Sequence, residues 1–158
     1  MELNINDFKR FEKQIILKKI GIGGQKKIKN SKVLIVGMGG LGCPLITYLA
    51  SAGVCNIGIV DNDRVELSNL NRQTLFNSYD IGKFKATQVK VKIKKIYNRK
   101  KIKVFRERIS SKNINQIFKN YDIICDGTDN FESRYLINDQ CKKNKKVLIS
   151  AAISKFDG

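Results

Sequence analysis

The sequence contains no histidine, and it has no apolar run long enough to cross a membrane. A membrane-spanning helix needs about 20 consecutive apolar residues, and no segment approaches that length. The first residues, Met1–Asp7, lack the basic and then apolar layout of a secretion signal. The sequence therefore predicts neither a membrane-spanning helix nor a secretion signal, and we expect a cytoplasmic protein.

Cysteine is scarce and scattered. The four residues Cys43, Cys55, Cys125 and Cys141 include no C-x-x-C pair, so neither a metal cage nor a disulfide framework is indicated. Three of the four lie in or beside apolar segments, which predicts buried free thiols. We expect this chain to bind no zinc.

Acidic residues are few, with 14 Asp and Glu against 31 Lys and Arg and a net charge of +17. Eleven basic residues and no acid lie between Asp80 and Glu107. No nucleic-acid-binding motif accompanies them, and aromatic residues are not interleaved as stacking platforms would require. We therefore do not expect nucleic acid as the main partner. The basic stretch is interpreted as a solvated face or as a surface for an acidic protein partner.

The order of expected elements predicts one α/β domain with a Rossmann-like parallel sheet and helices on both faces. Apolar runs rich in β-branched residues are typical of buried parallel strands. We expect strands at 33–36, 55–60, 102–105, 122–126 and 146–150, and helices after Gly42, at 86–96, at 111–119 and from 130 to about 141.

Residues 1–30 are expected to form a helical segment that packs on a core domain of residues 31–158. One or two short helices are predicted within residues 7–29, and Gly21–Gly24 should break the pattern. The apolar residues expected to form a stripe there are Phe8, Phe11, Ile15 and Ile16.

The segment Lys32–Gly42 has the strongest functional signal. A buried strand ends in Gly37, Gly39, Gly40 and Gly42, which satisfy G-x-G-x-x-G, and a helix follows. Backbone N–H groups and the helix dipole favour an anion at such a turn. The next strand ends in Asp61, where a carboxylate can accept bonds from ribose hydroxyls. These residues predict a nucleotide site; glycines needed only for close packing are the alternative.

Five elements in order carry a resemblance to a known family. They are the glycine loop, Asp61-x-Asp63, Leu67–Gln73, Lys85 and Thr128–Asn130. From about Phe8 to Gly158 the chain resembles the N-terminal part of the ThiF/MoeB (HesA/MoeB/ThiF) family, the ATP-dependent adenylyltransferases that activate ubiquitin-like proteins. The resemblance implies adenylation of the C-terminal glycine of a small sulfur-carrier protein in thiamine or molybdopterin cofactor synthesis. ATP and Mg²⁺ are then expected, and pyrophosphate is released.

The resemblance assigns roles that the chemistry of the residues suits. The glycine loop supplies N–H donors, and Arg72 and Lys85 supply cations for phosphate oxygens. Asn69 can orient an oxygen, and Asp61 suits the ribose. Asp129 suits Mg²⁺. The binding set is completed by Asp63, Ser68 and Asn130.

Each of these residues has a structural alternative. Asp61 and Asp129 could be helix N-caps, and Arg72 could pair with Glu66 or Asp63. Asn130 could orient Asp129, cap the following helix, or do both.

Two departures from the family pattern stand out. Where relatives carry an arginine that reaches the neighbouring subunit's ATP, this chain has Lys13, which keeps the charge but not the bidentate geometry. A homodimer with Lys13 acting across the interface is nevertheless expected. Relatives also continue past residues 156–158 with cysteine pairs that bind zinc, so we expect the sheet to be incomplete at its C-terminal side.

Two other functions compete with adenylation. An NAD-dependent oxidoreductase would share the opening strand and glycine turn, but it is disfavoured by the absence of histidine, the commonest general acid–base. A remnant that binds ATP or a carrier protein without turnover is the other alternative.

Overall fold

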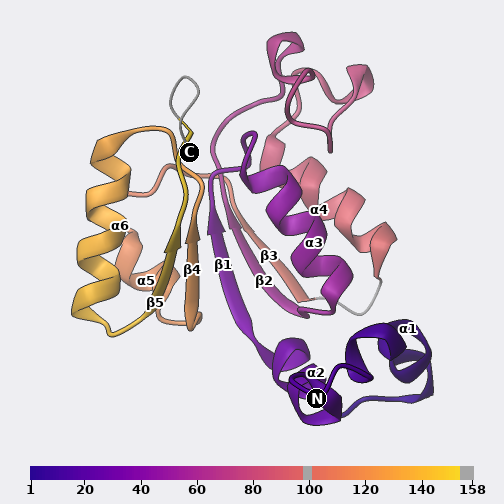
Figure 1. Cartoon of the computed structure of the whole chain (residues 1–158). Coiled ribbons are helices and arrows are strands. Elements are labelled where there is room, and N and C mark those ends of the chain that lie inside the picture. The colour runs from indigo at the N-terminus through magenta and orange to yellow at the C-terminus, as the bar shows by residue number, and fades with distance from the viewer. Residues whose placement is uncertain (98–100, 154–158) are drawn as a thin grey trace.

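The computed structural model describes residues 1–97 and 101–153, and within them the chain forms a five-stranded parallel sheet. The strand order is β3-β2-β1-β4-β5, with bounds β1 Lys32–Val36, β2 Asn56–Val60, β3 Lys101–Phe105, β4 Ile123–Asp126 and β5 Val147–Ser150 (Figure 1). The predicted Rossmann-like parallel sheet is confirmed. Parts of two predictions lie outside the described residues: positions 98–100 of the basic stretch, and the domain end at 154–158.

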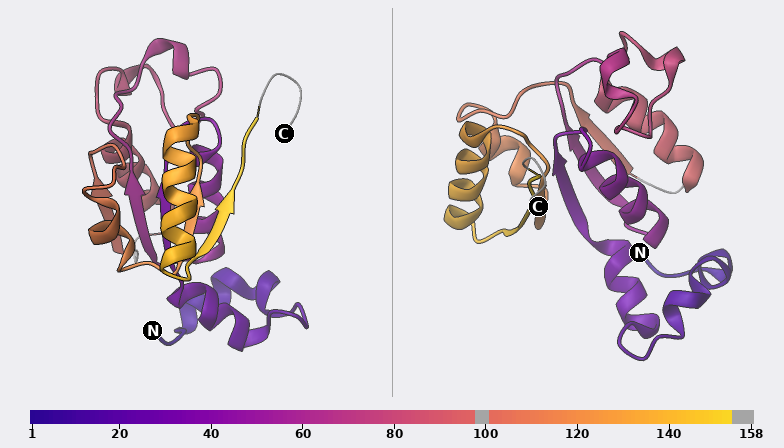
Figure 2. Two further views of the ribbon diagram at one scale, coloured as in Figure 1. Left: turned by 90° about the vertical axis from the view of Figure 1, so that its left-hand side faces the viewer. Right: turned by 45° about the horizontal axis from the view of Figure 1, so that its top comes forward.

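Helices cover both faces of the sheet, as predicted (Figure 2). One face packs against α3 (Gly42–Ala52) and α4 (Lys85–Ile96), and the other against α5 (Ile114–Phe118) and α6 (Phe131–Lys143). Apolar side chains from alternate positions of the central strands enter two separate cores. Ile35 belongs to the first core and Leu34 to the second, and both are fully buried. Such burial on both faces explains why these strands lack a polar alternation.

Helix α4 presents the predicted apolar face, because Ala86, Val89 and Ile93 are fully buried and Ile96 packs against the same core. Helix α5 is shorter than predicted. The Asn113 side chain accepts the Ser110 N–H at 2.8 Å, and this local turn keeps residues 111–113 out of the helix.

Two N-terminal helices, α1 (Ile5–Ile15) and α2 (Gly21–Asn30), lie at the amino end of the sheet (Figure 1). The prediction that Gly21–Gly24 breaks the helical pattern is wrong, since these residues form the first turn of α2. The chain turns earlier, where the N–H groups of Ile20 and Gly21 both donate to the Leu17 carbonyl. Gly21 has φ of +57°, which a residue without Cβ adopts readily.

The expected apolar stripe of α1 is only partly buried. Phe11 is buried against the end of α3, and its ring meets Tyr97 edge-on at 5.8 Å. Phe8 and Ile16 remain 39% and 66% exposed. The stripe therefore divides into Phe11, which anchors α1, Ile15, which is half-buried, and two residues that face solvent.

All four cysteines are free and buried, as predicted. Burial raises the pKa of the Cys43 thiol to about 12, so it stays protonated at neutral pH. A membrane-crossing helix is absent from the described residues, because none is both long and apolar enough.

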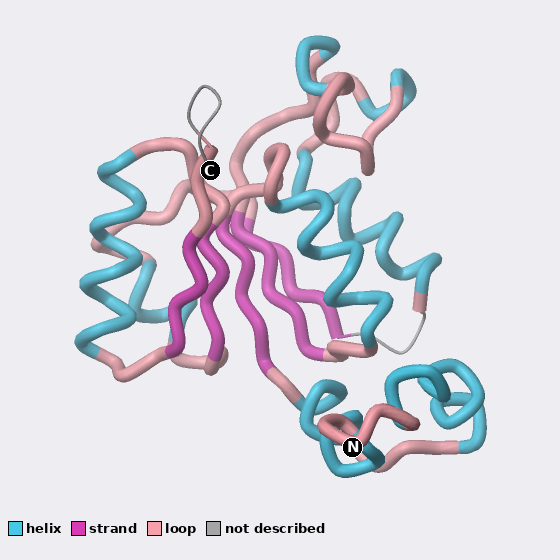
Figure 3. Tube along the Cα trace, in the orientation of Figure 1, coloured by secondary structure: helices cyan, strands magenta, loops and turns pink. Residues whose placement is uncertain are grey.

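Because all strands are parallel, their carboxyl ends meet at one edge of the sheet (Figure 3). The chain proceeds outward from β1 to β2 and β3 on one side, and then from β4 to β5 on the other. The order therefore reverses between β1 and β4, and ligands usually bind beyond the carboxyl ends of the strands at such a point.

Candidate functional site at the carboxyl ends of the strands

The glycine loop after β1 contains two kinds of glycine. A Cβ on Gly42 would lie 2.0 Å from the Gly37 carbonyl oxygen, and one on Gly37 would lie 2.8 Å from that of Gly127. These two glycines are needed for close backbone packing. Gly39 and Gly40 are different, because a Cβ there would meet only side-chain atoms of Gln73 and Arg72, at 3.7 Å or more.

The N–H groups of the loop divide in the same way. Gly37 donates to the Val60 carbonyl at 2.9 Å, and Met38 donates to the Asp61 carboxylate at 2.7 Å. The N–H groups of Gly39 and Gly40 have no partner among residues 1–97 and 101–153. Helix α3 begins directly after them, at Gly42. Free donors at a helix N-terminus favour an anion.

Asp61 ties the end of β2 to this loop. One carboxylate oxygen accepts the Met38 N–H, and the other accepts the Asp63 N–H at 2.8 Å. Burial raises the pKa of the Asp61 carboxyl, and these two N–H bonds oppose the rise. The N-cap alternative for Asp61 is wrong, because the carboxylate joins a strand end to a loop.

Arg72 lies over Gly40, in the segment after β2. Its Nη1 donates to the Ser68 carbonyl at 2.9 Å and to Asn71 Oδ1 at 3.3 Å. No ion pair within the described part of the chain includes Arg72, so the alternative pairing with Glu66 or Asp63 is wrong. A guanidinium without a carboxylate partner remains available to an anion.

Two predicted binding residues shape this segment. Asn69 is buried in the short helix η1 (Leu67–Asn69), where its Oδ1 accepts the Glu66 N–H at 3.2 Å. Ser68 donates to the Glu66 carboxylate at 3.3 Å. Both side chains hold the turn that places Arg72.

Lys85 is the first residue of α4 and is only 7% exposed. An ammonium at a helix N-terminus opposes the helix dipole. Lys85 Nζ bonds Asp63 Oδ2 at 3.0 Å, and the Asp63 side chain is 59% exposed. The positive charge of Lys85 also acts on the nearby Asp61 carboxylate.

The end of β4 carries the remaining predicted residues. Asn130 accepts the Ser133 N–H at 2.9 Å and is the N-cap of α6, which confirms the capping prediction. The N-cap alternative for Asp129 is therefore wrong. Asp129 itself is exposed. Gly127 joins this segment to the glycine loop through its close approach to Gly37.

Sequence reasoning missed Asp126 and Gln73. Asp126 is buried at the end of β4 and accepts bonds from Thr128 N–H, Thr128 Oγ1 and Ser150 Oγ at 2.9, 2.7 and 3.0 Å. Gln73 is buried beside Gly39 with its Oε1 unpaired. The available signal was their position in the motifs, since Asp126 lies two residues before Thr128 and Gln73 directly follows Arg72.

Lys13 is the predicted residue that the fold does not bring to this site. It lies on α1, at the opposite end of the sheet, and its side chain is 85% exposed. Its only ion pair among the described residues is with Glu12, at 3.8 Å. Within one chain, Lys13 therefore stands apart from the glycine loop.

Known proteins resemble this chain in sequence and fold. It is 45% identical over 155 residues to a probable molybdopterin-synthase adenylyltransferase of Porphyra purpurea, which covers 98% of this chain and 41% of that protein. A crystal structure of E. coli MccB with ATP is 30% identical, with a TM-score of 0.77 over 83% of this chain and 40% of that one. E. coli tRNA N6-threonylcarbamoyladenosine dehydratase, TcdA, solved with ATP, has a TM-score of 0.86 over 95% of this chain and 61% of that chain; at 22% identity it shows the fold alone.

The chain thus spans about two fifths of the length of the curated relative that it matches. The model of the ThiF family matches residues 11–158. This match covers the glycine loop, the Arg72 segment, Lys85 and the end of β4. The chain belongs to the ThiF family.

Proposed function

We propose that this chain is the ATP-binding part of an adenylyltransferase that activates the C-terminal glycine of a small ubiquitin-like sulfur-carrier protein. The relative named molybdopterin-synthase adenylyltransferase favours the molybdopterin pathway over the thiamine pathway. One observation carries the proposal. The N–H groups of Gly39 and Gly40 are free, and the aliphatic part of the Arg72 side chain contacts the Gly40 position. The Arg72 guanidinium has no carboxylate partner among the described residues.

The residues fit ATP. Gly39 and Gly40 leave space for phosphate oxygens to approach the backbone, and Arg72 and Lys85 supply positive charge from two neighbouring segments. Asp61, placed by Met38 and Asp63, has lone pairs left for ribose hydroxyls.

Mg²⁺ also fits the proposed site. Asp129 offers an exposed carboxylate, and no three metal-ligating side chains cluster within residues 1–97 and 101–153. Mg²⁺ is commonly held by one or two carboxylates together with substrate phosphates and water. Bound there, it would neutralise phosphate charge.

The proposed reaction joins two anions. A carboxylate oxygen of the carrier's terminal glycine forms a bond to the α-phosphorus, and the bond to the pyrophosphate oxygen breaks. Charge moves from the carboxylate to the phosphate oxygens and the leaving group. In this proposal Arg72, Lys85 and the loop N–H groups would stabilise that charge, which is the main demand of such a transfer.

Pyrophosphate exchange by the full chain with Mg-ATP and purified sulfur carriers tests the proposal. Exchange that depends on a carrier is expected. Calorimetry with ATP and NAD separates the alternatives, since ATP binding without exchange would indicate a binding-only protein. Preference for NAD would reject the proposal.

Two glycine variants test the location of the site. Gly40→Ala meets no backbone and should keep the fold, but its methyl group occupies the anion position, so ATP affinity should fall about tenfold. Gly23→Ala, in open space on α2, is the matched control and should bind ATP normally. Equal ATP affinity in the two variants would show that ATP does not bind at Gly40.

We further propose that the protein is a homodimer in which Lys13 reaches the partner's site. The exposure of Lys13 and its distance from its own glycine loop support this. Lys13→Ala should lower exchange without changing the fold, and Lys13→Arg should preserve it. If light scattering shows a monomer and that monomer is fully active in exchange, this role of Lys13 is rejected.

A further inference from the structure

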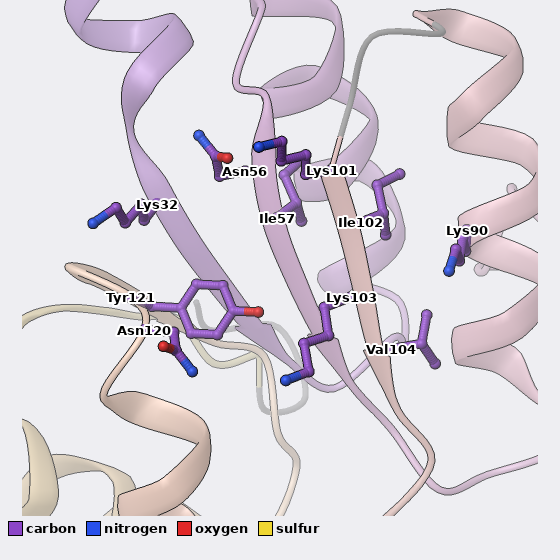
Figure 4. Close-up of a pocket in the computed structure, with 10 residues that line it drawn as sticks. All are labelled: Lys32, Asn56, Ile57, Lys90, Lys101, Ile102, Lys103, Val104, Asn120 and Tyr121. Carbon is purple, nitrogen blue, oxygen red and sulfur yellow. The ribbon is translucent and has the colours of Figure 1, made fainter. Parts of the chain in front are cut away.

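A large basic hollow lies along the edge strand β3, at the amino half of the sheet (Figure 4). Its volume is about 540 Å³, and its lining includes Lys32, Lys90, Lys101, Lys103 and Tyr121. None of the described residues that line it carries a carboxylate. The proposed ATP site does not use this hollow, because the glycine loop lies at the carboxyl ends of the strands.

The hollow extends to both faces of β3. In Figure 4, Lys32, Lys101, Lys103 and Tyr121 lie on one side of the strand, and Lys90 lies on the other with Ile102 and Val104. A second hollow of about 210 Å³ shares Lys103 and Asn120 with the first and adds residues as far as Glu107. The two together follow the strand along its length, which suits an extended ligand better than a compact one.

The backbone of β3 has a free side at this hollow. Lys101 N–H donates to the Cys55 carbonyl at 2.7 Å, and the Phe105 carbonyl accepts the Asp61 N–H at 3.1 Å, so these residues face β2. By the two-residue alternation of a strand, the N–H and C=O groups of Ile102 and Val104 point away from β2. No described strand lies on that side.

The lysines that line the hollow favour an acidic partner. A second copy of this chain would place lysines against lysines, in a protein whose net charge is +17. Nucleic acid is disfavoured because neither aromatic ring at the two hollows has an open face on which a base could stack. Tyr121 is buried, and the half-buried Phe105 is covered by Lys103 Nζ at 5.0 Å.

We propose that the edge of β3 binds an extended acidic segment of a partner protein as an added strand. Backbone hydrogen bonds to Ile102 and Val104 would supply affinity, as in other cases of strand addition. Carboxylates at alternate positions would face Lys101 and Lys103, and apolar side chains between them would face Ile102 and Val104. About five residues, roughly 17 Å, would match the length of β3.

A labelled synthetic peptide of alternating glutamate and valine, added to the full chain, tests this by fluorescence polarisation and amide hydrogen exchange. Binding that weakens with salt is expected. The Ile102 and Val104 amides should become protected, because they gain partners. The same peptide with alternate backbone nitrogens methylated should not bind.

Paired variants locate the contact. Lys101→Gln with Lys103→Gln should weaken peptide binding about tenfold. Lys142→Gln with Lys143→Gln, an equal charge change on exposed residues of α6, should leave binding unchanged. Circular dichroism of both variants confirms that each is folded.

Three results would overturn the proposal. One is no peptide binding at low salt. Another is equal binding of the methylated peptide. The third is that tripolyphosphate or an oligonucleotide competes with the peptide, with no protection of the Ile102 and Val104 amides in the complex; these ligands need the lysines but not the strand edge.

Discussion

Two buried lysines, at opposite ends of the sheet, differ in how completely their charge is paired. Lys29 on α2 lies 2.7 Å from Asp7, with the two side chains 5% and 1% exposed. It also donates to the Glu2 carbonyl at 2.6 Å, and Asp7 accepts from Tyr97 and from the Asn4 N–H. Lys85 is as deeply buried, yet its partner Asp63 is largely exposed.

The difference distinguishes a structural pair from a pair suited to binding. At the amino end, the polar atoms of Lys29 and Asp7 are enclosed by protein partners, and the pair joins α1, α2 and Tyr97 after α4. At the carboxyl end, Lys85 has one partner that water already reaches. A cation so arranged can exchange its carboxylate for a phosphate at modest free-energy cost.

The largest effect is expected when the enclosed pair is broken. Lys29→Met leaves the Asp7 carboxylate buried without its cation and should lower the free energy of unfolding by about 3–5 kcal/mol. Lys85→Met, the counterpart, should cost about 1 kcal/mol or less, because Asp63 is solvated. Urea unfolding measures both. Asp7→Asn with Lys29→Met should regain most of the loss, whereas equal losses at the two lysines would remove the distinction.

Substitutions at the carboxyl end of the sheet should lower turnover more than substitutions at the amino end. Arg72→Ala and Lys85→Met should each reduce pyrophosphate exchange about a hundredfold, mainly in kcat, because in the proposed reaction they face charge that shifts. Lys26→Met removes a lysine from an ion pair with Glu2 at the amino end and is the matched control. A loss confined to the KM for ATP would contradict the roles of Arg72 and Lys85.

Acid should destabilise the packing of α1 and α2 at the amino end of the sheet. Burial raises the pKa of the Asp7 carboxyl, but hydrogen bonds from Lys29, Tyr97 and the Asn4 N–H lower it by more. The net result is a pKa of about 2, against an ordinary value of 3.8. This stabilisation, about 2 kcal/mol, is present above pH 4 and is lost as pH falls through 2. Denaturant unfolding between pH 5 and pH 2.5 measures it, and Asp7→Asn should flatten the dependence.

The Asp61 carboxyl should affect stability in the opposite direction over the same pH range. Its pKa is raised, so the folded state favours the protonated form and loses stability as pH rises above the unfolded value of 3.8. Asp61→Asn should therefore steepen the loss of stability on acidification. A variant with an unchanged slope would show that the Asp61 carboxyl titrates normally.

The smallest expected effect concerns two helix caps. Asn4 caps α1 at the amino end and Asn130 caps α6 at the carboxyl end, each through an asparagine oxygen. Asn4→Ala and Asn130→Ala should each cost about 1 kcal/mol in thermal unfolding. Only Asn130→Ala should also lower exchange, because Asn130 follows Asp129. Equal activity of the two variants would limit Asn130 to capping.

Most of the fold could be predicted because its strands are buried on both faces. Continuous apolar runs such as Val33–Val36 leave little ambiguity, and the glycine turn after them fixes the first crossover. The helix start at Gly21 could not be predicted. Its cause is tertiary, since Gln25 on the next turn is buried and donates to the Ala52 carbonyl at 3.0 Å.

Most of the residues that meet at the carboxyl ends of the strands could be predicted from the motifs, but their contacts could not. Motif order identifies Asp61, Arg72 and Lys85, and parallel strands bring their segments to one edge of the sheet. Sequence did not reveal that Asp63 pairs with Lys85 while Arg72 has no carboxylate partner in the described part of the chain, because such pairings depend on side-chain geometry. Asp126 was missed because a carboxylate that bonds its own loop resembles any strand-end residue in sequence.

The strand order has a consequence for synthesis on the ribosome. Val33 in β1 pairs with Ile57 of β2 on one side and with Ile123 of β4 on the other. The half-sheet of β1, β2 and β3 is therefore complete in sequence well before β4 emerges. Until then, the apolar central strand has an unpaired edge, and non-local closure of this kind is slow. The side of β1 that later pairs with β4 is thus open to mispairing while the chain is still being made.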